Sequence, residues 1–177
     1  MRILVAITGA SGLEYGRRLV EVLKKTKNIQ ASVVVSSGAK KVAKAEGAKL
    51  PKADYGEFDF SCPHASGSNP VDAMIVIPCS LKTLGEIANG VGNSLITRAA
   101  EVALKERKKL ILVVRETPYS LITIKNMERV TLAGGVILPA TPGFYGKPRK
   151  VQDLIDFVVA RVLDQLGIEN HISRRWE

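Results

Sequence analysis

The first twelve residues, MRILVAITGASG (1–12), contain the pattern that decides the fold. An uninterrupted apolar run at residues 2–7 leads at once into a turn of small residues. A second apolar run, at 31–35, ends in the same way in Ser-Ser-Gly, and residues 13–25 between the two runs have apolar side chains at helical spacing. Continuously apolar strands joined by a helix are typical of a parallel sheet that is covered on both faces. The N-terminal part of the chain therefore predicts a strand–helix–strand unit.

The same alternation continues through the rest of the chain. Further strands are expected at 71–78, 110–114 and 136–139, and helices at 39–45, 81–89, 95–106, 121–132 and 151–166. This alternation predicts an open, doubly wound, mostly parallel sheet, a three-layer α/β/α arrangement of the Rossmann-like, flavodoxin type. No repeat or low-complexity linker interrupts it, so residues 1–177 are expected to form a single domain. The stretches 51–70 and 140–149 are rich in Pro, Gly and Ser, and we expect them to be functional loops.

Composition argues against several classes of protein. No apolar run approaches the roughly 18 residues that cross a bilayer, and the N-terminal run lacks the features of a signal peptide, so we expect a cytoplasmic protein without membrane contact. Two cysteines and two histidines, without a C-x-x-C pair, argue against a disulfide framework and a metal site. The net charge of +9 leaves three interpretations: nucleic acid, small anionic ligands or a solvated basic surface. The lysine-rich segments lack interleaved aromatic residues, which argues against nucleic acid.

Small and hydroxyl residues follow the predicted strands at the edge where open parallel sheets bind ligands. The four turns are 8–12, 36–38, 79–83 and 115–118. Gly9 and Gly12 allow a close approach of the backbone, and helix N-termini attract phosphate. Each Ser or Thr could instead be only an N-cap worth about 1 kcal/mol, but four such turns at one edge favour a phosphate site. The dinucleotide and Walker fingerprints are absent, so a mononucleotide such as FMN fits better than NAD or ATP.

Charged side chains supply the remaining candidates. Arg98 and Lys105 are seven residues apart and are expected on one face of a helix. Arg161 has no carboxylate four residues away, so it either binds an anion or extends into solvent. The candidates for proton transfer, each of which could also be a solvated surface group, are Glu46, Glu116 and Tyr145.

Motifs along nearly the whole chain add a resemblance. They include TGASG (8–12), Ser36 with Glu46 ten residues later, ASGS (65–68), PCSLKTL (78–84), RAAEVALKERKKLILVVRETP (98–118), NM (126–127), PATPGFYGKP (139–148), DLIDFVVARVLDQLGI (153–168) and RW (175–176). TGASG alone carries little weight, whereas LKER followed by a strand to RE-x-P and then PGFY is highly specific. With these motifs the chain resembles the UbiX flavin prenyltransferase family. Residues 48–61 do not match the family pattern clearly.

The resemblance implies a set of ligands and roles. Reduced FMN would be held by Gly9, Ala10, Ser11, Ser36, Ser80, Leu81, Lys82, Thr83 and Arg115. Dimethylallyl phosphate would be held by Tyr145, Arg161, Arg98 and Lys105. The catalytic residues would be Lys105, Glu46 as acid and base, and Ser11 and Glu116 as proton relays. The family uses no metal, forms homo-oligomers that are dodecamers with sites where subunits meet, and supplies prenylated FMN to a UbiD-type decarboxylase.

The implied chemistry explains this choice of residues. The prenyl group would join flavin N5 through its C1 and flavin C6 through its C3, while phosphate leaves. Fixed cations stabilise the charge that develops on the leaving phosphate. Phe60 could form an aromatic wall for the allylic cation or merely pack in its loop. Two alternatives stay open: a flavin-dependent decarboxylase of the peptidyl-cysteine type, which needs a His base, and an FMN carrier without catalysis. The choice between a monophosphate and a diphosphate donor is open as well.

Overall fold

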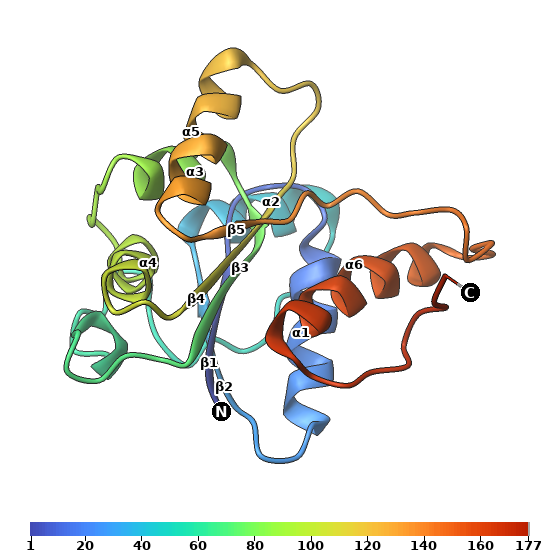
Figure 1. The fold of residues 1–177 in the computed structure, drawn as a ribbon, viewed down its shortest axis with the longest axis horizontal. Helices are drawn as coiled ribbons and strands as arrows, with labels where there is room; N and C mark the ends of the chain where they lie inside the picture. The colour runs from blue at the N-terminus through green and yellow to red at the C-terminus, as the bar shows by residue number, and fades with distance from the viewer. Residues whose placement is uncertain (177) are drawn as a thin grey trace.

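A five-stranded parallel sheet forms the centre of the computed structural model, which describes residues 1–176 (Figure 1). The strands are β1 (Arg2–Ile7), β2 (Gln30–Val35), β3 (Ala73–Cys79), β4 (Lys109–Val114) and β5 (Val136–Ile137). Their order in the sheet is β2-β1-β3-β4-β5, and each neighbouring pair is parallel. This is the flavodoxin strand order, so the predicted doubly wound fold is confirmed.

Helices cover both faces of the sheet. Helices α1 (Leu13–Lys25) and α6 (Val151–Leu166) lie on one face, and α3 (Leu81–Ala88), α4 (Leu95–Lys105) and α5 (Leu121–Leu132) lie on the other (Figure 1). Helix α2 (Ser37–Glu46) follows β2 and contributes Ala39 and Ala43 to the core beneath α1 and α6. The predicted bounds of all these elements agree with the structure to within two residues. No helix within residues 1–176 is both long enough and apolar enough to cross a membrane.

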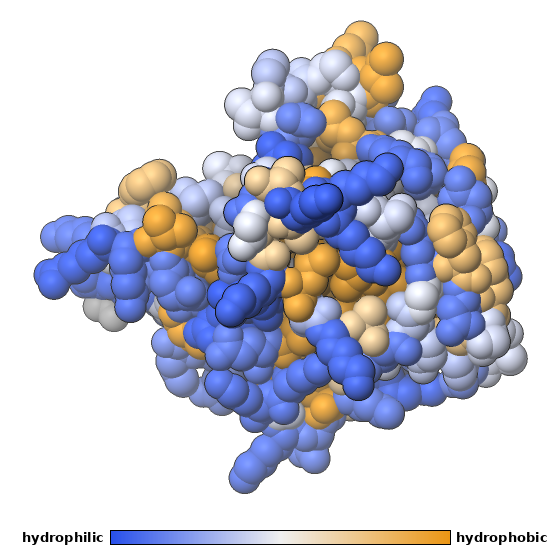
Figure 2. Space-filling model, turned by 180° about the vertical axis from the view of Figure 1, so that it is seen from behind, coloured by the Kyte–Doolittle hydropathy of each residue, from blue (hydrophilic) through white to orange (hydrophobic). Residues whose placement is uncertain are grey.

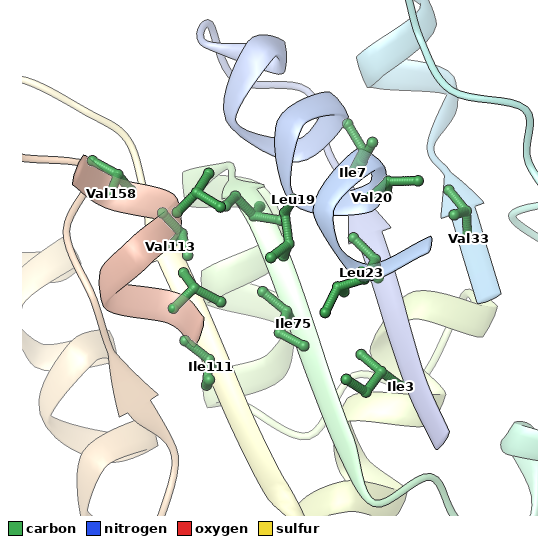
Figure 3. Close-up of a cluster of buried hydrophobic side chains, with 14 of the residues drawn as sticks. Ile3, Ile7, Leu19, Val20, Leu23, Val33, Ile75, Ile111, Val113 and Val158 are labelled. Carbon is green, nitrogen blue, oxygen red and sulfur yellow. The ribbon is translucent and has the colours of Figure 1, made fainter. Parts of the chain in front are cut away.

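The core consists of two layers separated by the sheet. Alternate side chains of β1 point to opposite faces: Ile3, Val5 and Ile7 pack beneath α1 and α6, whereas Leu4 and Ala6 pack beneath α3 and α4. Figure 3 shows the first layer, in which side chains of α1 and α6 meet those of the strands. Every residue of β3 is buried, because the strand lies in the middle of the sheet with helices on both sides. The double coverage explains why the strands are continuously apolar in sequence.

The long loop between α2 and β3 follows the outer edge of β2. The carboxylate of Asp54 accepts a hydrogen bond from Val33 N at 2.9 Å, and Tyr55 pairs with Val34 in an isolated parallel bridge. Further along, Pro63–Ala65 form a short 3₁₀ helix (η1) that the sequence pattern did not predict, and this turn packs against α4. Between Tyr55 and this turn the loop passes the carboxyl edge of the sheet, where Glu57 accepts a hydrogen bond from Ser37 N at 2.6 Å.

Gly16 lies where α1 approaches the sheet closely. A Cβ atom at this position would lie 2.4 Å from the carbonyl oxygen of Ile77, which is backbone and cannot rotate away. We expect Gly16→Ala to lower the free energy of unfolding by about 1–3 kcal/mol, measured by urea denaturation. Gly85→Ala in α3 is the matched control, since its Cβ would meet only the Asn126 side chain at 3.6 Å. The control should be neutral or stabilising by up to about 1 kcal/mol, and equal losses in both variants would contradict the packing argument.

Candidate functional site

A cavity of about 400 Å³ opens at the carboxyl ends of β1, β2 and β3. It lies where the chain, after β1, adds β2 on one side and β3 on the other, which is the place where open α/β sheets bind ligands. Six of the nine residues predicted to hold a mononucleotide line it: Gly9, Ser36, Ser80, Leu81, Lys82 and Thr83. The structure therefore brings three turns that are distant in sequence to one cavity.

Thr8 fastens the turn after β1 to the turn after β3. Its buried hydroxyl donates to the Pro78 carbonyl at 2.8 Å and accepts a hydrogen bond from Ser80 N at 2.8 Å. Sequence reasoning included Thr8 in the TGASG turn but gave it no role, because its partners are about seventy residues away in the chain. These two hydrogen bonds fix the backbone that positions Gly9 and Ser80.

Two glycines form part of the cavity floor. A Cβ on Gly9 would lie 2.9 Å from the carbonyl carbon of Gly38, and a Cβ on Gly38 would lie 3.3 Å from Gly9 Cα. The turns after β1 and β2 are therefore in backbone contact. Since neither position carries a side chain, a ligand can approach the main chain directly.

Three helices begin at this cavity, each with a serine as its N-cap. Ser36 Oγ accepts from Ala39 N at 3.0 Å, Ser80 Oγ from Thr83 N at 3.3 Å, and Ser94 Oγ from Thr97 N at 3.2 Å. These hydrogen bonds confirm that the three serines are N-caps, the alternative role that the sequence left open for Ser36 and Ser80. This role is compatible with anion binding, because each N-terminus also has free N–H groups and a partial positive charge. The N-termini of α2, α3 and α4 together favour a phosphate group in the cavity.

Arg115 supplies an observation that fits a ligand with oxygen acceptors. Its backbone N donates to the Cys79 carbonyl at 3.3 Å, which places the residue beside the Ser80 turn. Its Nε is buried and has no hydrogen-bond partner within the described chain. A buried guanidinium nitrogen needs an acceptor, and a mononucleotide would provide one. No group of three or more His, Cys, Asp or Glu side chains among residues 1–176 is arranged to hold a metal ion.

Tyr145 and Arg161 lie in a different pocket, of about 230 Å³, between α6 and the C-terminal segment. The Tyr145 ring meets the rings of Phe157 and Trp176 edge to face, with centroids 5.6 and 5.2 Å apart. Arg161 Nη1 lies 2.8 Å from a carboxylate oxygen of Asp164. This pair was not predicted, because no carboxylate lies four residues from Arg161 and Asp164 lies three residues away. Arg161 is a paired cation beside an aromatic cluster.

Asp164 holds the C-terminal segment against α6. Its carboxylate accepts two hydrogen bonds from Arg175, both at 2.7 Å, and one from Asn170 at 3.0 Å, in addition to its pair with Arg161. These partners, Arg175 first, lower the pKa of Asp164 below its ordinary value. Because Trp176 follows Arg175, the ion pair also keeps the indole beside Tyr145.

Acid should release this C-terminal segment. A carboxyl group whose pKa is lowered by folding contributes stability above its unfolded pKa of about 3.9 and loses it as the pH falls through the lowered value. We therefore expect the fluorescence of Trp176, the only tryptophan, to stay constant from neutral pH to about pH 5 and to change below about pH 4. Asp164→Asn should show the changed fluorescence already at pH 7, whereas Glu169→Gln, an exposed neighbour, should not. An unchanged spectrum in Asp164→Asn would contradict this role.

Arg98 and Lys105 both contact the ASGS turn from α4. Arg98 Nε donates to the Ala65 carbonyl at 3.1 Å, and its guanidinium pairs with Glu101 at 2.9 Å. Lys105 pairs with Glu106 and lies against Gly67. The two cations thus share one face of α4, as their spacing predicted. They lie on the opposite side of the sheet from Arg161, because α4 and α6 cover different faces (Figure 1).

The predicted proton-transfer residues are not gathered at the cavity. Glu46 ends α2 and is exposed, about 15 Å along the helix from Ser36. Glu116 accepts a hydrogen bond from Thr117 N at 2.9 Å. Ala10 and Ser11 follow Gly9 but do not belong to the cavity lining. Within one chain, the cavity at the carboxyl edge of the sheet, the Tyr145–Arg161 pocket and the predicted acid–base residue Glu46 therefore lie apart from one another.

Glu57 is a cavity residue that sequence reasoning missed. It lies in the loop between α2 and β3, and its carboxylate accepts a hydrogen bond from Ser37 N at 2.6 Å. The segment has no helical or alternating apolar pattern, so no signal in the sequence marked it. Phe60, proposed as an aromatic wall, lies in the same loop and is about half exposed.

Comparisons with known proteins identify the relatives of this chain. The family profile described as Flavoprotein matches residues 1–163. A flavin prenyltransferase UbiX from Methanocaldococcus jannaschii is 47% identical, and the alignment covers 99% of this chain and 98% of the relative. The chain belongs to the UbiX flavin prenyltransferase family. The family resemblance seen in the sequence is thereby confirmed.

Solved structures agree with this membership. The crystal structure of AnUbiX (PadA1) in complex with FMN and dimethylallyl pyrophosphate has a TM-score of 0.94 and 43% identity, and the match covers 99% of this chain and 97% of that one. A dodecameric FMN-dependent UbiX-like decarboxylase from Escherichia coli O157:H7 has a TM-score of 0.93 and 39% identity, with full coverage of both chains. The peptidyl-cysteine decarboxylase EpiD is only 18% identical at a TM-score of 0.59, so its likeness extends to the fold alone.

Proposed function

We propose that this flavin prenyltransferase transfers a dimethylallyl group from dimethylallyl phosphate to reduced FMN. The observation that carries the proposal is the cavity at the switch point of the sheet, where three helix N-termini converge. Arg115, on the turn next to Ser80, adds a buried Nε without a hydrogen-bond partner among residues 1–176. A cavity of this kind suits a mononucleotide phosphate. Further support comes from AnUbiX, which binds FMN and dimethylallyl pyrophosphate and shares 43% of its residues with this chain. The peptidyl-cysteine alternative has no comparable support.

The predicted flavin-binding residues divide into two groups around the cavity. Gly9, Ser36 and the Ser80–Thr83 turn line it, and they would hold the phosphate through backbone N–H groups and hydroxyls. Ala10, Ser11 and Arg115 lie on the adjoining turns and would contact the rest of the flavin. When bound, reduced FMN supplies two nucleophilic atoms, N5 and C6.

The second set of residues would bind the prenyl donor and assist its phosphate to leave. Lys105, Arg98 and Arg161 are fixed cations, each already oriented by a carboxylate, and Tyr145 adds a hydroxyl donor. Preorganised positive charge at the leaving phosphate lowers the barrier without reorganisation during the reaction. Glu46 would accept the proton released at C6, and Ser11 and Glu116 would relay protons. No metal is needed for these steps.

We infer that neighbouring subunits complete the site. Arg161 on α6 and Lys105 on α4 lie on opposite faces of one sheet, so a single chain cannot place both on one small phosphate. Exposed apolar residues on α5 offer a surface for association: Leu121, Ile122, Ile124 and Leu132 are 50–81% exposed. Hydrophobic atoms stand out at this projecting end of the molecule (Figure 2). A homo-oligomer, a dodecamer as in the relative from Escherichia coli, would bring the separate groups together.

The remaining parts of the proposal concern the context of the reaction. We infer that the whole chain acts as a single flavoprotein domain, since both core layers pack against one sheet. We also propose that it works in the cytoplasm and that a UbiD-type decarboxylase receives the prenylated FMN.

One experiment tests the reaction. The protein is incubated with reduced FMN and dimethylallyl phosphate without oxygen, and the flavin is then weighed by mass spectrometry. A gain of one C5 unit is expected, whereas bound but unchanged flavin would indicate a carrier. Dimethylallyl diphosphate in a parallel sample distinguishes the two donors.

A further inference from the structure

Glu57 reaches into the cavity that we assign to the flavin phosphate and connects two helix N-termini there. Its carboxylate accepts the Ser37 N–H at 2.6 Å, and its carbonyl oxygen accepts the Leu95 N–H at 2.8 Å. Ser37 and Leu95 are the first residues of α2 and α4. A negative charge from a distant loop therefore already occupies the N-terminus of α2.

A carboxylate and a phosphate would compete for this position. Both are stabilised by the free N–H groups and the partial positive charge at the start of a helix. The Ser37 N–H cannot donate fully to both, and two anions in one cavity repel each other. The lysines at the cavity rim offset this repulsion only slightly, because Lys41 and Lys82 are exposed to solvent and Lys82 lies 3.4 Å from Glu86.

The loop around Glu57 is built so that its side chain can leave without disturbing the core. Asp54 fastens the loop to β2 three residues earlier, through its 2.9 Å hydrogen bond with Val33 N. Beyond Glu57, Phe58 is 66% exposed and Phe60 is 48% exposed, so little buried surface resists a movement of this segment. Displacement of the carboxylate therefore breaks only the local hydrogen bonds.

We propose that Glu57 lowers the affinity of the flavin site for phosphorylated ligands and speeds their release. Its carboxylate occupies the N-terminus of α2 when the site is empty, is displaced when the phosphate of FMN binds, and returns as the flavin leaves. The inference rests on the proposed function, in which the flavin product is made here and used by another protein. A residue that weakens binding of the phosphate alone would favour that transfer.

The test compares two flavins that differ only in the phosphate. Dissociation constants for FMN and riboflavin are measured by quenching of flavin fluorescence, and the release of FMN is followed by stopped flow. Glu57→Gln should bind FMN roughly 3–10-fold more tightly and release it correspondingly more slowly, with riboflavin affinity unchanged. Glu57→Asp keeps the charge but is one methylene shorter, so it should shift FMN affinity in the same direction and provides the answer if Glu57→Gln does not fold.

Asp59→Asn is the matched control. It removes the same charge from the same loop, but the Asp59 carboxylate is bonded to Ser61 N at 3.1 Å and does not line the cavity. Its FMN affinity should equal that of the unmodified protein. Unchanged or weaker FMN binding in folded Glu57→Gln overturns the inference, as does equal tightening in Asp59→Asn. If the unmodified protein binds no FMN, the proposed function fails as well; if it binds FMN and only the Glu57 effect is missing, the proposed function stands.

Discussion

Arg161→Met should slow prenyl transfer by about 10²–10³-fold and leave FMN affinity within twofold of the unmodified protein. Arg161 lies in the pocket beside Tyr145, apart from the cavity that we assign to the flavin, and Asp164 orients its guanidinium at 2.8 Å. The substitution removes one cation that would stabilise the leaving phosphate, and it removes none of the residues that would bind FMN. The rate of prenylated flavin formation and an FMN titration, measured on the same preparation, check both halves of the prediction.

A second arginine on the same side of the sheet provides the control. Arg18 in α1 lies 2.6 Å from Asp156 of α6, so Arg18→Met also breaks an arginine–carboxylate contact with α6. It should affect stability but not the rate. Arg161→Lys should recover only part of the activity, because an ammonium group lacks the planar fork that binds phosphate in a bidentate manner. Loss of FMN binding in Arg161→Met would place this residue in the flavin site and contradict the division into two groups.

The fold could be predicted from the sequence because its signals are local. Each strand contains a short apolar run, and three of the first four runs lead into a turn of small or hydroxyl residues, as RILVAI leads into TGASG. The helix at 151–166 could be placed to the residue, since its apolar spacing extends over four turns. Even the predicted ligand edge followed from topology, because parallel strands end at one rim.

The internal geometry of the site could not be predicted, because it depends on contacts between distant residues. Nothing near Thr8 indicates that Pro78 and Ser80 are its partners, and nothing near Glu57 indicates that it reaches Ser37. The identities of the predicted site residues also gave no information on which face of the sheet each side chain would occupy. Arg161 and Lys105 were grouped by their charge, yet the structure separates them by the full thickness of the sheet.

Because the structure keeps the predicted site residues apart within one chain, we expect a second large effect: mixing two inactive variants should restore activity. Arg115→Met should lack a functional flavin site and Arg161→Met a functional prenyl-phosphate site, so each alone should be nearly inactive. If each site takes Arg115 from one subunit and Arg161 from a neighbour, random co-assembly leaves about one quarter of the sites intact. Co-expression with two different tags, purification of the doubly tagged oligomer and a prenylation assay should therefore recover about one quarter of the normal activity.

A mixture of Tyr145→Phe and Arg161→Met distinguishes shared sites from a nonspecific effect of mixing. Tyr145 and Arg161 line the same pocket within one chain, so every site in this second mixture receives a pocket that lacks one of the two. Its activity should be the average of the two parent variants, without recovery. Recovery in the first mixture and no recovery in the second would require that the flavin-binding residues and the phosphate pocket of one site come from different chains. No recovery in the first mixture would mean that a single chain holds both, which would demand a rearrangement of α6 relative to the sheet.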